Sequence, residues 1–63
     1  MDRQYDIFER FPDGELLWRA VKVGREQSLR KLQELAARSH NEVLAMHVPT
    51  KEIIATLNAP LKK

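Results

Sequence analysis

Phe11-Pro12-Asp13-Gly14-Glu15-Leu16 stands between two runs rich in β-branched and aromatic residues, 3–11 and 16–23. Proline at the second position of a turn fixes φ near the value that a type I turn needs. Gly14 accepts the positive φ of the residue that returns the chain into the second strand. The stretch therefore predicts a β-hairpin near the N-terminus.

A second stretch of the same kind, Val48-Pro49-Thr50-Lys51-Glu52-Ile53, lies between residues 42–48 and 52–57. Lys51 occupies the place that Gly14 has in the first turn, so we expect a positive φ at a non-glycine residue, at a cost of about 1 kcal/mol. The two similar hairpins are compatible with an internal duplication, although similar turns also arise by coincidence.

Residues 25–40 have the apolar periodicity of an amphipathic helix. Charged residues of alternating sign follow one another on the opposite side, as on a solvated helix surface. We expect Gly24 to be the N-cap and Asn41 to end the helix in the left-handed conformation. The apolar stripe contains Leu29, Leu32, Leu35 and Ala36.

The order of elements is ββαββ, which predicts an α+β fold with a four-stranded, mainly antiparallel sheet and one amphipathic helix on one face. With 63 residues the chain has room for one small domain, which we place at residues 1–57, followed by a flexible tail at 58–63. The absence of cysteine excludes disulfides and thiolate chemistry.

Both faces of the predicted sheet carry large apolar side chains, whereas one helix can cover only one face. We assign to the helix side Ile7, Val21, Val43, Ala45, Ile53, Ala55 and Leu57. The uncovered side then holds Phe8, Trp18, Leu44, Met46 and Ile54. A patch of this size exceeds the few hundred Å² of exposed apolar surface that is usual for a soluble monomer.

A second copy of the chain is the commonest partner for such a patch, so we expect a homodimer packed sheet to sheet. The alternative is a strongly twisted monomer whose two hairpins wrap around the helix and bury both sets of residues. If the chain forms the homodimer, it is a small non-enzymatic interaction module.

Nucleic-acid binding is the rival hypothesis for the same face. Phe8 and Trp18, flanked by Arg10 and Lys22, have the composition of a platform on which unpaired bases stack. The same two rings also fit a cross-strand hydrophobic pair. The net charge of +2, with basic and acidic residues interspersed, does not indicate a polyanion partner.

Candidate catalytic and metal-binding residues are few. His40 and His47 with Glu42 and Glu52 have no spacing specific to a metal site. Ser39 and His40 are adjacent on the predicted helix and cannot form a nucleophile–base pair. We therefore predict no catalytic residue, metal or cofactor.

The run from Tyr5 to Trp18, centred on Phe-Pro-Asp-Gly-Glu-Leu-Leu-Trp and followed by an Arg/Glu/Leu helix and a second hairpin, resembles short bacterial proteins of uncharacterised role. The likeness covers residues 4–57 and brings no catalytic or binding residues with it. The chain has neither a membrane-spanning apolar run nor a signal-peptide pattern in its first ten residues, so we expect a cytoplasmic protein.

Overall fold

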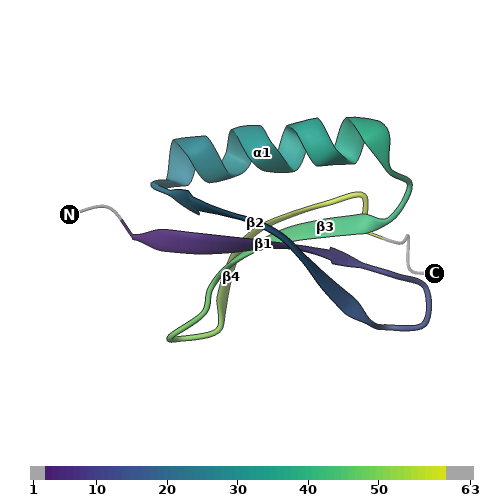
Figure 1. Ribbon diagram of the computed structural model, residues 1–63, viewed down its shortest axis with the longest axis horizontal. Coiled ribbons are helices and arrows are strands. Elements are labelled where there is room, and N and C mark those ends of the chain that lie inside the picture. Colours follow the sequence, from purple (N-terminus) through teal and green to yellow (C-terminus); the bar gives the residue numbers. More distant parts are fainter. Residues whose placement is uncertain (1–2, 60–63) are drawn as a thin grey trace.

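In the computed structural model, which describes residues 3–59, one antiparallel hairpin precedes the helix along the chain and a second hairpin follows it (Figure 1). The elements are β1 (Gln4–Arg10), β2 (Leu16–Val23), α1 (Arg25–Arg38), β3 (Glu42–His47) and β4 (Glu52–Leu57). The strands form one sheet, and the helix lies along one face of it. The predicted α+β fold with ββαββ order is confirmed.

The two hairpins join through their first strands, which gives the strand order β2-β1-β3-β4. β1 and β3 are antiparallel, with Ile7 opposite Ala45 and Phe8 opposite Leu44. The second strand of each hairpin, β2 or β4, is therefore an edge of the sheet.

Both turns have the predicted backbone conformation. In the first turn Gly14 has φ 93° and its amide donates to the Phe11 carbonyl at 2.8 Å. In the second turn Lys51 has φ 60° and its amide donates to the Val48 carbonyl at 3.1 Å. The expectation of a strained lysine in the position of the first turn's glycine is confirmed.

Each edge strand contains one residue more than its partner strand over the paired region. Phe8 is opposite Trp18 but Ile7 is opposite Ala20, so Arg19 is the extra residue of β2. In β4 the register steps from Ala45–Ala55 to Met46–Ile53, which leaves Ile54 as the extra residue. Such β-bulges reverse the side-chain alternation beyond the extra residue.

The bulges correct three parts of the sequence-based assignment. Val21, assigned from the sequence to the helix side, is opposite Asp6 and lies on the face away from the helix. Ile53 is opposite Met46 and lies on that same face. Ile54, predicted for the uncovered side, packs instead against the hydrophobic core on the helix side.

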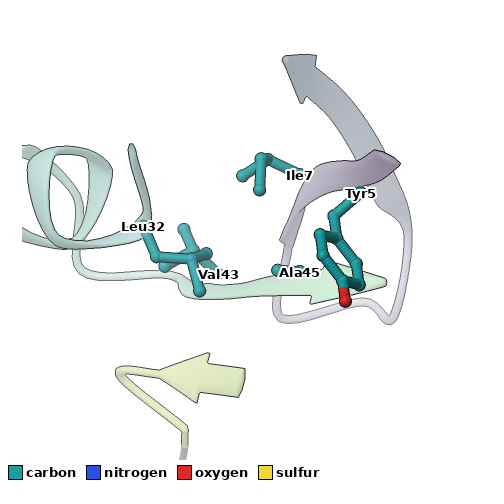
Figure 2. Close-up of a cluster of buried hydrophobic side chains, with 5 residues drawn as sticks. All are labelled: Tyr5, Ile7, Leu32, Val43 and Ala45. Atoms are coloured by element: carbon teal, nitrogen blue, oxygen red, sulfur yellow. The ribbon is translucent and has the colours of Figure 1, made fainter. Parts of the chain in front are cut away.

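The hydrophobic core lies between α1 and the two central strands (Figure 2). Leu32 projects from the helix toward Val43, and Ile7 and Ala45 lie beside it from β1 and β3. These four side chains are completely buried, and Tyr5 closes the cluster at one end. Leu29, Leu35 and Ala36 of the predicted stripe pack around this cluster.

The two ends of α1 differ in how well the sequence predicted them. Gly24 is the N-cap, as expected, with φ 88°. The helix ends at Arg38 rather than at residue 40, and Asn41 does not have the predicted positive φ.

The C-terminal end of the helix is held by a residue distant in sequence. Asn58, with φ 60°, donates its side-chain amide to the carbonyls of Ser39 at 2.9 Å, Ala36 at 3.1 Å and Asn41 at 3.4 Å. Carbonyls at a helix end otherwise have no intrahelical partner. The first residue of the predicted tail is thus bonded to the domain, and residues 60–63 of that tail lie outside the described residues.

One carboxylate is buried beneath the same end of the helix. Glu9 accepts hydrogen bonds from the Asn41 amide and the Ser39 hydroxyl, both at 2.8 Å, and Arg19 Nε lies 3.7 Å from it. The bonds from Asn41 and Ser39 lower the pKa of the Glu9 carboxyl below its ordinary value of 4.5; burial opposes them, and the charge of Arg19 adds to them. Glu9 therefore ties β1 to the loop that joins α1 to β3.

Replacing Lys51 with glycine should raise the free energy of unfolding by up to about 1 kcal/mol, because glycine adopts a positive φ without steric cost. The gain is reduced by the greater freedom of glycine in the unfolded chain. Thermal unfolding measures the effect. Lys51→Ala removes the same side chain but keeps the strain, so it should show no gain, and an equal rise in both variants would contradict the explanation.

Glu9→Gln should destabilise the protein at pH 7 by about 1.5–3 kcal/mol, the range for hydrogen bonds to a charged group. The pKa of Glu9 is lower in the folded than in the unfolded chain, so its contribution is complete above the unfolded pKa near 4.5. That contribution is lost as the pH falls through the folded pKa.

Urea unfolding followed by circular dichroism at several pH values from 7 down to 3 tests this linkage. The difference between the parent protein and Glu9→Gln should shrink as the pH falls. Glu15→Gln, at an exposed carboxylate in the first turn, is the control and should remain close to the parent. A difference between parent and Glu9→Gln that does not vary with pH would refute the role of the ionised carboxylate.

Candidate functional site

The sheet face opposite α1, here called the open face, has no second layer over it in the part of the chain that the structure describes (Figure 1). The pairing registers place on it the apolar residues Phe8, Leu16, Trp18, Val21, Val23, Leu44, Met46 and Ile53. Four of the five residues predicted for this surface are therefore brought together, and Ile54 is not.

Solvent exposure on the open face is concentrated toward the edges of the sheet. Trp18 is 53% exposed and Ile53 46%, and Leu16, Val21 and Val23 of β2 are also exposed. Phe8 and Met46 are half-buried. Leu44 is completely buried, which corrects the expectation that it forms part of an uncovered surface.

The position of Leu44 in the sheet explains its burial. It lies in the central strand β3, between Phe8 on one side and Thr56 on the other. The sheet is strongly twisted, and the ends of both hairpins point away from the helix (Figure 1). Side chains directly opposite one another on neighbouring strands are close enough to touch, so Phe8 and Thr56 cover Leu44 from both sides. Leu44 therefore packs beneath the other side chains of the open face, whereas Trp18 and Ile53 are exposed to solvent.

Trp18 is fixed in orientation although more than half of it is exposed. Its Nε1 donates to Oδ2 of Asp6 at 2.9 Å, and Asp6 lies on the open face of β1. The polar atom of the indole is thereby satisfied within the chain, and the ring offers mainly apolar surface. A fixed aromatic ring loses little conformational entropy when a partner covers it.

The charges on the open face are few and of both signs. Arg10 forms an ion pair with Glu42 across the β1–β3 pairing at 3.2 Å, and Asp6 accepts from Trp18. Lys22, the second predicted nucleic-acid contact, is opposite Tyr5 and so lies on the helix side. There it lines a shallow hollow with α1 residues, so the expected pair of cations beside Phe8 and Trp18 is not formed.

Several hydroxyl groups and the His47 imidazole have local partners. Ser28 donates to the Gly24 carbonyl, Ser39 to Glu9, and Thr50 to the His47 carbonyl. His47 Nδ1 lies 2.9 Å from the Thr50 hydroxyl, and its ring meets Tyr5 edge-on. Within residues 3–59 no three His, Asp or Glu side chains gather in a way that could hold a metal ion.

Comparisons with protein-family models, with curated proteins and with solved structures give no significant match. The resemblance to short bacterial proteins therefore depends on the turn and strand pattern alone. No helix of the described residues has the length and apolar character needed to cross a membrane.

Sequence reasoning missed Leu16, Val21, Val23 and Ile53 as members of the open face. The signal for Leu16 was available, since Leu16 and Trp18 are two residues apart in one strand and alternation places both on the same face. For the other three the strand alternation gave either no assignment or the wrong face, because it carries no mark of a bulge.

Proposed function

We propose that the chain is a small, non-enzymatic interaction module that binds a second copy of itself through the open face. The observation that carries the proposal is the exposure of Trp18 together with Leu16, Val21, Val23 and Ile53 on one uncovered sheet face. A buried tryptophan alone removes about 150–250 Å² from water. The five exposed side chains form apolar surface of the extent that often marks an interaction site in a soluble protein.

The dimensions of the face fit a partner of the same size. The whole molecule measures 38 × 23 × 21 Å along its principal axes, and the helix and the sheet are stacked across the longest of them, so the open face runs along the length of the molecule (Figure 1). A face of that length can supply the ~800 Å² that each partner buries in a standard interface.

The composition of the face favours a copy of itself over a charged partner. Asp6, Arg10 and Glu42 on the central strands supply both signs, and the exposed apolar residues lie on either side of them on β2 and β4. A two-fold axis can therefore set each group against a complementary one.

Ile53→Lys should weaken self-association by at least tenfold, because it places an unpaired cation in the apolar contact while leaving the helix-side core intact. Sedimentation equilibrium over a micromolar concentration series measures the effect. Gln33→Lys, which adds the same charge on the exposed side of α1, is the control and should associate like the parent.

Quenching of Trp18 fluorescence by acrylamide gives a second readout, since it should decrease as the parent protein associates. Thermal unfolding of each variant verifies that it is folded. A parent protein that remains monomeric throughout the series, or an Ile53→Lys variant that associates as strongly as the parent, would refute the proposal.

Nucleic-acid binding by the same face is tested separately. A surface that contacts several phosphates loses affinity steeply as salt rises, and Arg10, the predicted cation that lies on the open face, is already paired with Glu42. We expect single-stranded and duplex oligonucleotides to leave Trp18 fluorescence unchanged at low salt. Quenching that disappears at higher salt would favour the nucleic-acid alternative.

A further inference from the structure

The edge strand β2 is unusually apolar for a strand whose outer side has no neighbour. It provides five of the seven exposed large hydrophobic residues found within residues 3–59. Leu17, which is 43% exposed, lies on the helix side, whereas Leu16, Trp18, Val21 and Val23 lie on the open face. Both sides of this edge are therefore apolar, so the open-face contact alone leaves part of it uncovered.

The outward-pointing backbone groups of β2 can be derived from the hydrogen bonds at its two ends. The Phe11 amide donates to the Glu15 carbonyl at 2.9 Å, and the Gly24 amide donates to the Arg3 carbonyl at 2.8 Å. Residues whose backbone groups point toward β1 alternate with residues whose groups point away from it. Counting residues from either end of β2 therefore identifies the same ones as pointing away. By this alternation the outward amides and carbonyls belong to Leu16, Trp18, Val21 and Val23, and no described strand lies on the outer side of β2 to pair with them.

The bulge at Arg19 makes β2 symmetric about its midpoint. Residues 16 and 18 before it, and 21 and 23 after it, lie on the open face, whereas residues 17, 19, 20 and 22 lie on the helix side. The order of faces is thus the same in both directions from the point between Arg19 and Ala20. If a second copy of β2 runs antiparallel to the first with these midpoints side by side, residues that lie opposite each other have their side chains on the same face of the joined sheet.

We propose that β2 pairs in antiparallel fashion with β2 of a second copy, about a two-fold axis between Arg19 and Ala20. This register sets Leu16 against Val23 of the second copy and Trp18 against its Val21, and the outward backbone groups of these four residues meet. Leu17 lies against the aliphatic chain of the second copy's Lys22. The product is a continuous eight-stranded sheet.

The charges of β2 are compatible with this register. Neither cation lies opposite another, since Lys22 is set against Leu17 and Arg19 against Ala20 of the second copy. The two Arg19 side chains approach the axis, but each has the Glu9 carboxylate of its own chain 3.7 Å away. Like charges directly opposite would destabilise a strand pair.

The other edge of the sheet is less suited to the same contact. β4 is shorter, and its own bulge at Ile54 gives a symmetric register that sets Ile53 against Thr56 and Glu52 against Leu57. Glu52 is also engaged by Arg3 at 3.2 Å. We therefore assign the edge contact to β2 and to one occupant, a second copy of this chain.

The edge contact is separate from the contact between open faces and does not require it. A chain that makes both contacts forms an assembly larger than a dimer. Leu17 belongs to the edge contact alone and Ile53 to the open-face contact alone, so the two proposals can fail independently.

Disulfide trapping tests the register directly, because the chain has no native cysteine. Proteins carrying Leu16→Cys and Val23→Cys are oxidised separately and as an equimolar mixture. In the proposed register the two Leu16 positions of a pair lie about 20 Å apart, so either protein alone should give little covalent dimer. The mixture should give at least tenfold more, in the mixed form.

A mixture of Leu16→Cys and Gln33→Cys is the control and should yield no such enrichment, since Gln33 lies on the exposed side of α1, away from both contacts. Adding Leu17→Lys to both trapping variants should abolish the mixed dimer, whereas adding Ile53→Lys should preserve it. Mixed dimers no more abundant than those from each protein alone would overturn the edge contact, while leaving the open-face proposal to its own test.

Discussion

A single helix of fourteen residues covers a sheet of four strands, and this imbalance shapes the rest of the molecule. The helix contributes Leu32 to a small core with Ile7, Val43 and Ala45, and that core takes up one face of the sheet. A chain of this length buries only about 60% of the surface it exposes when unfolded. Large apolar residues on the other face therefore remain in contact with water unless another molecule covers them.

The two β-bulges determine which apolar residues lie on the open face. Each lies on an edge strand, where an added residue disturbs one ladder instead of two. Arg19 moves Val21 and Val23 to the open face and carries its own guanidinium toward Glu9 on the helix side. Ile54 enters the core side and leaves Ile53 exposed. The same distortions that complete the core thus supply the apolar surface.

Polar contacts fix the end of the molecule where the helix meets the sheet. Asn58 satisfies carbonyls at the end of α1, and Glu9 bonds to Ser39 and Asn41 in the next loop. These residues come from β1, from the segment after β4 and from the α1–β3 connection. Glu9 is buried with its hydrogen bonds satisfied, and such buried polar groups favour one arrangement of the elements that they connect.

The local elements were determined by the sequence: prolines at the turns, Gly14 and Lys51 at positive φ, and the leucine stripe of the helix are short-range patterns that act whatever the neighbouring strands do. The surplus of apolar residues over what one helix can cover was equally visible. The exact faces of Val21, Ile53 and Ile54, the burial of Leu44 and the capping by Asn58 depended on the tertiary structure. An extra residue in a strand has no local signature, because it arises only when that strand must match the register of a partner across the sheet.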